Sequence, residues 1–579
     1  MCGIAGILKF TGEFVTIDEL KKITDIIRHR GPDNDGFWIN SPKNLGFGHR
    51  RLSIIDLSDN GKQPMHYSNG RYTITYNGEI YNYIELKKTL QSKGYLFQSD
   101  CDTEVLLALY DFRKEACLDD LDGMFAFAIW DEDTRELFCA RDRFGEKPFH
   151  YYCDERQFVF GSEIKQFWEF GISKKVSEKR IDAYLEAGLI DDENDITSTF
   201  YDNIKRLDAA HYLIIKENKI MIRKYWSIDL SKKFTDSLQA ASEKLEELLT
   251  ESISLRLRSD VPVGSSLSGG IDSSTIVMLI DKLKGSEQKQ TSFSARFKNF
   301  DKDEGKYIQS VIAACRNIEP YYTWPDEKYF LENFDKINFC QDEPYGSSSI
   351  VAQYAVMELA AKNNVTVLLD GQGADEYFAG YPPYYNVYIN QLFFNNRAAY
   401  NNEIQLAEHY ANTQVKEIRE SLRMKIGRFR RTILSQEMPY STDALQNKLL
   451  FDTTSAGLKI LLRYADRNAM AHSREVRLPF LSHKLVEFVF SLPDNYKLHG
   501  GWTKYVLRKS MDKLLPQNIC WRKDKIGYAS PQNSWLHSPE MKEEIIRAGR
   551  FFNLSSTSKL SFEKDPEYGW RLLQASRFV

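Results

Sequence analysis

The sequence predicts two folded units, an α+β unit rich in antiparallel strands followed by an α/β unit with a parallel sheet. A chain of 579 residues is too long for a single hydrophobic core. In its first part, β-rich runs such as 72–76 and 124–130 alternate with Gly, Asn and Asp turns, which is typical of antiparallel strands. Farther on, the short apolar runs 261–267, 292–297 and 365–369 alternate with helical stretches, which is typical of parallel strands joined by helices.

The boundary between the two units is predicted from a change in the sequence near 226–235, which is polar and contains lysines. Directly after it, leucines from Leu238 and Leu245 onward are spaced to occupy one face of a helix. We therefore expect one domain at 1–226 and a second domain at 227–579.

The composition is that of a folded protein, with 42% hydrophobic and 27% charged residues. The 77 lysines and arginines nearly balance the 81 aspartates and glutamates, so no basic field for nucleic acid is expected. No stretch approaches the roughly 20 apolar residues that span a bilayer, and the first residues do not read as a secretory signal. The 8 cysteines include no Cys-x-x-Cys pair, which fits a reducing compartment. We expect a cytoplasmic protein that binds neither nucleic acid nor membrane.

Cys2 follows the initiator methionine directly, so removal of Met1 would leave a cysteine with a free α-amino group. One residue would then carry a nucleophilic thiol and, with a pKa of about 7.7 to 8.0, a base able to take its proton. A cysteine near the start of a chain is more often a small buried residue. The clusters that follow favour the nucleophile.

Four short clusters in the first unit supply what a thiol that cleaves an amide requires. Each has a plainer interpretation by itself: Asn77-Gly78 is typical of a hairpin turn and Asp102 of a helix cap. Attack on a side-chain amide creates an oxyanion, however, and the Asn77 amide and the Gly78 backbone N–H are two donors able to stabilise it. The clusters lie at 29–33, 50–54, 77–79 and 102–104.

A glycine-rich loop in the second unit predicts a phosphate site. The loop 268–274 reads Ser-Gly-Gly-Ile-Asp-Ser-Ser and stands between an apolar strand and an apolar helix. In this context, backbone N–H groups and the helix N-terminus bind an anion, and serine hydroxyls add donors. The Gly-x-x-x-x-Gly-Lys-Ser/Thr sequence of P-loop proteins does not occur in the chain.

A second loop, 370–376, follows the predicted strand 365–369. The carboxyl ends of parallel strands meet at one edge of a sheet, so both loops are expected to form a single site. We expect Asp272 and Asp375 to be the carboxylates that hold Mg²⁺ on a bound phosphate group, because Mg²⁺ prefers one or two carboxylates together with phosphate oxygens.

Together, these motifs resemble those of the asparagine synthetase family. Cys2 and the four clusters are similar to the glutaminase domain of class II glutamine amidotransferases, and the loop 268–274 is similar to the pyrophosphate loop of ATP pyrophosphatases. Further matches at 466–472, 475–481 and 521–528 extend the resemblance over almost the whole chain. It implies an N-terminal nucleophile (Ntn) hydrolase sandwich followed by an adenine nucleotide α-hydrolase-like α/β domain with extra helices.

The resemblance also assigns roles to individual residues. Cys2, Asn77 and Gly78 would be catalytic, as would Lys525, or alternatively Lys523, as a cation near the α-phosphate. Glutamine would be bound by Arg51, with Arg50 as the alternative, and by Asn77, Glu79 and Asp102. The residues expected to bind ATP and its pyrophosphate are Leu267, Ser268, Gly269, Gly270, Asp272, Ser273, Ser274, Gly371, Gln372 and Gly373, and those expected to bind Mg²⁺ are Asp272 and Asp375.

The implied activity is that of a glutamine-hydrolysing asparagine synthetase. Cys2 would release ammonia from glutamine, while the second domain would use ATP to adenylate aspartate for amidation, with AMP and pyrophosphate as products. Free ammonia is mostly protonated in neutral water, so we expect an enclosed, largely apolar passage between the two sites. Such enzymes are often dimers, so the resemblance also implies a homodimer.

Two positions depart from the family pattern. Gln372 stands where well-studied members have a carboxylate, and Ser482 stands where many have an aspartate. An amide cannot take a proton from ammonia, so a general-base role would pass to Glu376 or to a phosphate oxygen. The acceptor is therefore expected to be aspartate, with another carboxylate, such as a uronic sugar in surface polysaccharide biosynthesis, as the alternative.

The sequence disfavours two other functions. A stand-alone Ntn hydrolase with a regulatory second domain is disfavoured by the intact loop 268–274. A catalytically silent sensor of glutamine and nucleotide is disfavoured because Cys2, Asn77, Asp272 and Asp375 are all present.

Overall fold

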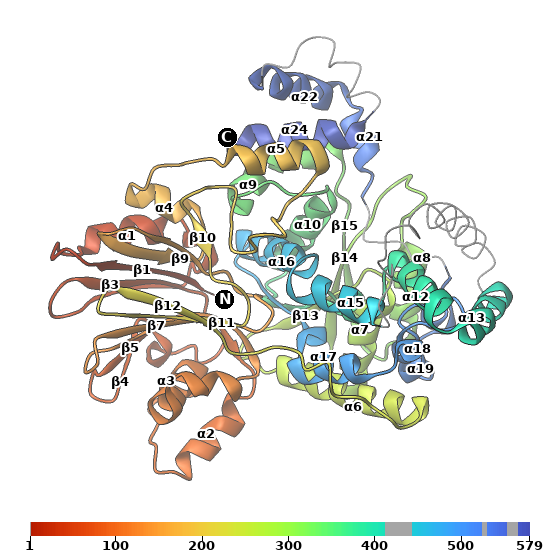
Figure 1. The fold of residues 1–579 in the computed structure, drawn as a ribbon, viewed down its shortest axis with the longest axis horizontal. Coiled ribbons are helices and arrows are strands. Elements are labelled where there is room, and N and C mark those ends of the chain that lie inside the picture. The colour runs from red at the N-terminus through yellow and green to blue at the C-terminus, as the bar shows by residue number, and fades with distance from the viewer. Residues whose placement is uncertain (1, 411–442, 524–529, 553–564) are drawn as a thin grey trace, which may run out of the picture.

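The computed structural model describes residues 2–410, 443–523, 530–552 and 565–579. The chain forms two units that lie side by side, a sandwich of antiparallel sheets and a parallel sheet covered by helices (Figure 1). This order of an α+β unit and an α/β unit is the one that the sequence predicts.

Two six-stranded sheets face each other in the first unit. Apolar residues of both sheets, among them Ile4, Phe47, Ala128 and Trp130, form the core between them. The strands of one sheet are, in spatial order, β10 (Lys205–Arg206), β8 (His150–Cys153), β9 (Gln157–Gly161), β1 (Gly3–Lys9), β3 (Leu45–Arg51) and β2 (Asn34–Ile39). Those of the other are β12 (Lys219–Lys224), β11 (His211–Lys216), β7 (Glu136–Arg141), β6 (Gly123–Asp131), β5 (Tyr72–Ile80) and β4 (Met65–Tyr67).

Helices cover the outer face of each sheet, so the first unit has four layers. Leu20 and Phe167 of the helices pack on Ile7 of one sheet, and Val105 packs on Ile74 of the other. Helices α1 (Ile17–Asp25) and α4 (Lys165–Phe170) lie on the first sheet, and α3 (Asp102–Arg113) lies on the second. Helix α2 (Tyr83–Gln91) packs on α3, and α5 (Glu178–Ala187) packs on α24 (Pro566–Phe578) of the second unit.

The five strands of the second unit all run parallel. Their order is β15 (Ile318–Thr323), β14 (Gln290–Ala295), β13 (Val263–Ser266), β16 (Val367–Leu369) and β17 (Glu475–Arg477). Helices α7 (Ile271–Lys284) and α10 (Ser349–Lys362) pack on the central strands. Because β13 and β16 are neighbours, the loops that follow them emerge next to each other at one edge of the sheet.

Most of the remaining helices surround this sheet, and α22 and α24 lie at one end of the molecule beside α5 (Figure 1). The remaining helices are α6 (Leu238–Arg256), α8 (Gly305–Ala314), α9 (Glu327–Gln341), α11 (Ala374–Tyr377), α12 (Pro382–Asn395), α13 (Arg397–Tyr410), α15 (Ala444–Thr454), α16 (Leu458–Ala471), α17 (His483–Ser491), α18 (Asp494–Lys497), α19 (Tyr505–Met511), α20 (Gln517–Cys520), α21 (Gln532–Leu536), α22 (Pro539–Phe551) and α24 (Pro566–Phe578). None of the described helices is both long and apolar enough to cross a bilayer.

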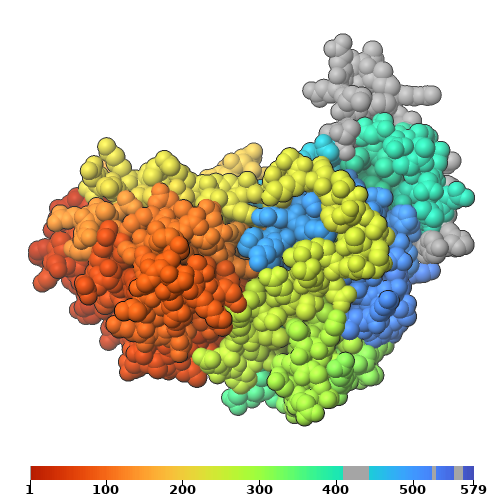
Figure 2. All heavy atoms as spheres, turned by 90° about the horizontal axis from the view of Figure 1, so that it is seen from below, coloured from red at the N-terminus to blue at the C-terminus, as the bar shows by residue number. Residues whose placement is uncertain are grey.

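The two units share a broad boundary, seen in Figure 2 between the red-to-orange and the green-to-blue atoms. An apolar cluster crosses it, since Leu52, Ile55 and Met124 belong to the same core as Leu267 and Leu478. Buried ion pairs cross it as well. Arg30 binds Asp466 through two hydrogen bonds of 2.8 and 2.9 Å, and both side chains are almost completely buried. The predicted boundary at residue 226 falls in the connection between β12 and α6.

Candidate active sites

A small cavity in the first unit brings together most of the residues that the sequence assigns to glutamine chemistry. Cys2, Arg51, Gly78, Glu79 and Asp102 all line it. Asn77 lies beneath this surface and is fully buried. The other lining residues are Leu52, Ile54, Ile55, Gly61, Gln63, Tyr76, Cys101, Thr103 and Glu475.

Cys2 lies at the start of β1 and is held by Asn77. Its backbone N–H donates to Asn77 Oδ1 at 2.9 Å, and its Sγ lies 4.0 Å from the Leu52 carbonyl oxygen. The Asn77 Nδ2 donor is buried and has no hydrogen-bond partner among the described residues. Burial raises the pKa of the Cys2 thiol, and the positive charge of Arg51 partly opposes this. The arrangement offers an unused donor beside a buried thiol, as an oxyanion site requires.

Asn77 and Gly78 lie inside β5, where they pair with Ala126 and Phe125, and not in a hairpin turn. A Cβ atom at Gly78 would lie 2.2 Å from the Met124 carbonyl oxygen. Glycine is therefore required at this position because strand β6 lies too close to leave room for a side chain.

The alternation of side chains along β3 separates Arg51 from Arg50. Arg51 lines the cavity, donates to the Ser58 carbonyl at 2.9 Å and also binds the Asp56 carbonyl. Arg50 points the other way, toward Asp25 and Asp35. The structure thus places Arg51, and not Arg50, at the cavity.

Gly61 is a part of this site that the sequence did not reveal. A Cβ atom there would lie only 2.0 Å from an Nη atom of Arg51. The glycine leaves the space that the guanidinium occupies.

Two buried carboxyl groups, Glu79 and Asp102, form the opposite wall. Asp102 is the first residue of α3, and it accepts hydrogen bonds from Tyr76 Oη at 2.8 Å and Ile80 N at 2.9 Å. Burial raises the pKa of both carboxyl groups above the ordinary value, and for Glu79 the negative charge of Asp102 adds to the effect. Such a pair gains from a cationic ligand, because an ammonium group compensates both charges.

Glu475 of β17, which belongs to the second unit, completes the first cavity. It accepts a hydrogen bond of 2.6 Å from Arg477 Nε, and Arg477 Nη2 reaches Glu79 Oε2 at 3.3 Å. The sequence pattern linked Glu475 and Arg477 only to the motif 475–481. No short-range signal could place them beside residues almost 400 positions away.

A larger cavity of about 320 Å³ lies at the carboxyl ends of β13 and β16. Its volume is in the range of small-molecule sites. Nine of the predicted residues line it: Leu267, Ser268, Gly270, Asp272, Ser273, Gly371, Gln372, Gly373 and Asp375. Gly269 and Ser274 do not line it.

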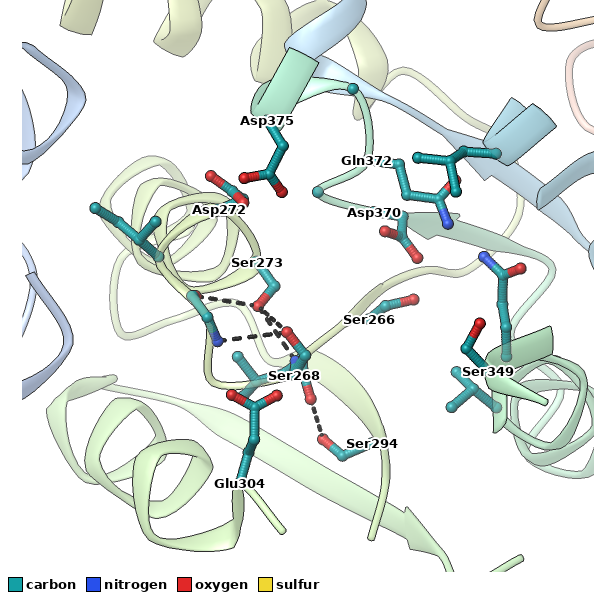
Figure 3. A pocket seen from close by; sticks show the side chains of 18 of the residues that line it. Ser266, Ser268, Asp272, Ser273, Ser294, Glu304, Ser349, Asp370, Gln372 and Asp375 are labelled. Carbon is teal, nitrogen blue, oxygen red and sulfur yellow. Dashed lines mark hydrogen bonds between the residues drawn. The ribbon is translucent and has the colours of Figure 1, made fainter. Parts of the chain in front are cut away.

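The loop 268–270 leads into α7 and is shaped by hydrogen bonds between its Ser268 and Ser273 of the helix (Figure 3). Ser273 Oγ accepts from Ser268 N at 3.2 Å and lies 3.1 Å from Ser268 Oγ. Gly269 has φ +81°, a left-handed conformation that favours glycine, so its role is to form the turn. Ser274 is fully buried in α7 and packs away from the cavity.

The second loop comes very close to the first. A Cβ atom at Gly371 would lie 2.9 Å from Ser273 N and 3.0 Å from Asp272 Cβ. The backbone of the loop after β16 therefore touches the N-terminal turn of α7, and both loops form one wall.

The carboxyl groups of Asp272 and Asp375 lie close together at one side of this cavity (Figure 3). Lys504 Nζ lies between them, 2.5 Å from Asp272 Oδ2 and 2.8 Å from Asp375 Oδ1. Lys504 is almost fully buried, and although burial lowers the pKa of its amine, the two carboxylates raise it to a net value above the ordinary one. Two carboxylates that share one cation are close enough to share a metal ion, so the donor set fits Mg²⁺.

Across the described ranges, no group of three or more His, Cys, Asp or Glu side chains is arranged to hold a metal. A magnesium ion at Asp272 and Asp375 would therefore complete its shell with phosphate oxygens and water, as Mg²⁺ commonly does.

Among the described residues, the cations that line the cavity are Lys504, Arg508 and Arg522. Lys523, the alternative in the sequence prediction, is exposed and does not line it. Lys525, the first choice, lies outside the described residues and stays a prediction. Lys504 follows Trp502-Thr503 in a stretch that reads as an ordinary loop, so the sequence carried no signal for it beyond the preceding glycines.

The two departures from the family pattern have different surroundings. Gln372 lines the cavity, and its Oε1 has no hydrogen-bond partner among the described residues. Ser482 is buried at the start of α17 and is not part of the lining. Glu376 also lines the cavity and accepts a hydrogen bond of 2.7 Å from Tyr381 Oη. Burial, and then the charge of Asp375, raises the pKa of Glu376 to about 7.

Two family models match this chain. The model of a glutamine amidotransferase domain matches residues 1–226, and that of asparagine synthase matches residues 244–558. A Bacillus subtilis (strain 168) protein, "Asparagine synthetase [glutamine-hydrolyzing] 1", is 32% identical and aligns over 94% of this chain and 89% of its own.

Other relatives carry similar names. A Methanocaldococcus jannaschii protein, "Putative asparagine synthetase [glutamine-hydrolyzing] 2", is 38% identical over 67% of this chain and 77% of its own. "Asparagine synthetase [glutamine-hydrolyzing] 3" of B. subtilis is 32% identical over 90% of this chain and 86% of its own. The chain therefore belongs to the glutamine-hydrolysing asparagine synthetase family.

Proposed function

We propose that this protein is a glutamine-hydrolysing asparagine synthetase, an ATP-dependent ligase with its glutaminase in residues 1–226 and its synthetase in residues 227–579. One observation carries the proposal: a single chain holds a buried thiol among amino-acid-binding groups in one cavity, and a phosphate-type loop with two convergent carboxylates in another. A stand-alone hydrolase or a silent sensor needs no such pair of sites.

In the first cavity, Cys2 attacks the side-chain amide of glutamine to form a γ-glutamyl thioester, with the α-amino group of the mature Cys2 as the base. Asn77 Nδ2 and Gly78 N–H stabilise the oxyanion that forms during the attack. Arg51 binds the α-carboxylate of the substrate, and Glu79 and Asp102 bind its α-ammonium. Ammonia leaves when the thioester forms, and water then releases glutamate.

In the second cavity, the loop 268–270 and the N-terminus of α7 bind the phosphates of ATP. Magnesium, when bound, neutralises the pyrophosphate so that a carboxylate can approach and take the adenylyl group. Asp272 and Asp375 would hold that ion, and Lys504, which binds both carboxylates and lines the same cavity, can stabilise phosphate charge. Lys525 remains the cation predicted from the sequence to lie near the α-phosphate.

Aspartate is the acceptor that we propose. The relatives with this pair of domains are named asparagine synthetases, and the unusual Ser482 lies outside the cavity. Gln372 does line the cavity, so its side chain is the one of the two that could contact and select a different acceptor. Nothing in the comparisons favours a uronic sugar.

Ammonia must travel from Cys2 to the adenylate, and an enclosed apolar passage remains our prediction. It is supported by the apolar cluster in which Leu52, Ile54 and Ile55, which line the first cavity, pack with the core of the second unit. We also propose a cytoplasmic enzyme, because all eight cysteines are free, as expected in a reducing compartment. A homodimer remains an expectation from the family resemblance.

The test is to incubate the purified protein with ATP, Mg²⁺, glutamine and a panel of carboxylates, and to follow AMP, glutamate and new amides by mass spectrometry. Asparagine, AMP and glutamate are expected together when aspartate is present. AMP formation with an amidated uronic acid, but none with aspartate, would refute the acceptor while retaining the chemistry. Glutamate release without AMP for any acceptor would refute the synthetase assignment.

A further inference from the structure

One buried arginine, Arg477, connects the two active-site regions. It is the last residue of β17, the edge strand of the parallel sheet nearest the first unit, and its side chain has 0% exposure. Its main chain contacts the loop of the nucleotide cavity, whereas its side chain contacts a residue of the glutamine cavity.

The main chain of Arg477 marks the point where the nucleotide loop begins. Arg477 pairs with Leu369, the last residue of β16. Its carbonyl oxygen then accepts a hydrogen bond of 2.9 Å from the N–H of Asp370. The residues that follow, from Asp370 to Gly373, line the nucleotide cavity. A shift of this loop along the strand direction would therefore pull on Arg477.

The side chain of Arg477 is fixed on three sides by the second unit. Its Nε donates to Glu475 at 2.6 Å, and its Nη1 donates to the carbonyl oxygens of Arg256 and Arg258 at 2.8 and 2.6 Å. The remaining nitrogen, Nη2, donates across the boundary to Glu79 Oε2 at 3.3 Å. A guanidinium held this way positions its partner instead of following it.

Glu79 depends on this contact. It is 3% exposed, it lies beside the Asp102 carboxyl group, and its other oxygen has no hydrogen-bond partner among the described residues. A buried carboxylate without a counter-charge takes up a proton, and a protonated Glu79 would not attract an ammonium group.

We propose that Arg477 is a positioning residue of the glutamine site, which holds Glu79 toward the α-ammonium of glutamine and links it to the loop 370–373 of the nucleotide cavity. This inference rests on the proposed function. The electrostatics agree with the geometry: burial and Asp102 raise the pKa of Glu79, whereas Arg477 lowers it.

The link has a thermodynamic consequence. If occupation of the nucleotide cavity moves the loop 370–373, the affinity of the first cavity for glutamine changes. Because coupling between two binding equilibria is reciprocal, glutamine must change the affinity for nucleotide by the same factor.

The experiment compares Arg477→Met and Arg477→Lys in the full chain, with Arg474→Met as a matched control. Arg474 lies three residues away in the same segment and binds the carbonyl oxygens of His472 and Val365, but no atom of the glutamine cavity. We expect Arg477→Met to raise the KM for glutamine by about tenfold or more, with kcat changed by less than about threefold. Arg477→Lys should recover part of this loss, and Arg474→Met should resemble the unsubstituted chain.

Synthesis from added ammonia serves as the measure of folding, because it does not use the first cavity. An unchanged glutamine KM in Arg477→Met would overturn the proposal. So would an equal fall of glutamine hydrolysis and ammonia-dependent synthesis, which would show a merely structural role.

Binding measurements keep the proposal testable even if Arg477→Met fails to fold. In the Cys2→Ala chain, which cannot hydrolyse glutamine, calorimetry gives the Kd for glutamine with and without Mg²⁺ and ATP, and the Kd for ATP with and without glutamine. We expect the same factor, different from one, in both directions. A factor of one would overturn the link. If the unsubstituted chain hydrolyses no glutamine at all, the proposed function has failed, and not this inference.

Discussion

The two cavities differ in how much of the chain each requires. Over the described residues, the nucleotide cavity is lined only by the second unit, from Ser266 to Arg522. The glutamine cavity combines residues of the first unit with Glu475 of the second. The synthetase site is thus complete in itself, whereas the glutaminase site depends on the neighbouring unit. The difference teaches that ammonia-dependent synthesis can survive damage to the first cavity, while glutamine use is sensitive to both units.

The cavities also differ in what holds their functional groups. Arg51, Asn77 and Glu79 lie on paired strands, and Asp102 lies in the first turn of a helix, so hydrogen bonds of regular secondary structure hold their backbones. In the second cavity, much of the phosphate-binding wall comes from two loops, which pack closely on one another. A rigid, buried first site and a loop-built second site suit a small invariant substrate and a large charged one.

The largest effect is expected from Cys2→Ala, which removes the thiol and leaves the second cavity intact. Glutamine-dependent synthesis should be lost completely, while synthesis from added ammonia should stay within about twofold of the unsubstituted chain. Assays of AMP formation with each nitrogen source measure both. Loss of both activities would contradict the independence of the nucleotide cavity.

Asp272→Asn should have the next largest effect, and it should damage the nucleotide cavity while sparing the glutamine cavity. Loss of one of the two convergent carboxylates should lower AMP formation by about a hundredfold or more, since metal-assisted charge stabilisation is worth several kcal/mol. Glutamine hydrolysis should persist. The exposed Glu287→Gln change is a control for loss of a negative charge in the same unit. Normal AMP release in Asp272→Asn would refute the metal assignment.

Gly61→Ala tests the space reserved for Arg51. The added methyl group would lie 2.0 Å from an Nη atom of Arg51 and 2.9 Å from the Asp56 carbonyl oxygen, so the guanidinium must move and the local backbone must shift slightly. We expect the KM for glutamine to rise about tenfold, the typical effect of disturbing a hydrogen bond to a charged group. The melting temperature should fall modestly, and ammonia-dependent synthesis should hardly change. A normal KM would mean that Arg51 does not bind the substrate in this position.

The smallest expected effect is a dependence of glutamine binding on pH. Glu79 faces Asp102, Arg477 and Glu475, and burial raises the pKa of both Glu79 and Asp102. Both carboxyl groups take up protons at low pH, and only their ionised forms attract the ammonium of glutamine. The KM for glutamine should therefore fall as the pH rises, and the fall should continue to a pH above the range in which ordinary carboxyl groups ionise. A KM that rises with pH would contradict the assignment of the two carboxyl groups.

The fold class and the two sites could be predicted because they depend on local patterns. Two of the three predicted parallel strands are shorter than their apolar runs: β13 covers Val263–Ser266 within the run 261–267, and β16 covers Val367–Leu369 within the run 365–369. The third, β14, covers Gln290–Ala295 and begins two residues before the run 292–297. Even so, the loop after each strand lies where the sequence indicates. A strand, a glycine-rich turn and a helix N-terminus are encoded within about ten residues, which is why the phosphate-type loop was recognisable.

Other features depend on tertiary structure and could not be predicted. The choice between Arg50 and Arg51 follows from which face of β3 meets the cavity, and Asn77-Gly78 proved to be part of a strand because β6 supplies its partner. Lys504 reaches its carboxylates from a loop more than 120 residues away from either one. The contact between Glu79 and Arg477 joins the two units across 398 positions.

The burial of Cys2 has a consequence for the substrate-free enzyme between turnovers. The side chain is only 8% exposed, and burial raises the pKa of its thiol. Oxidants and alkylating agents react with the thiolate and need access to it, so a protonated, shielded sulfur is a poor target for both. The residue on which glutamine use depends is therefore protected from chemical damage while the enzyme waits for substrate.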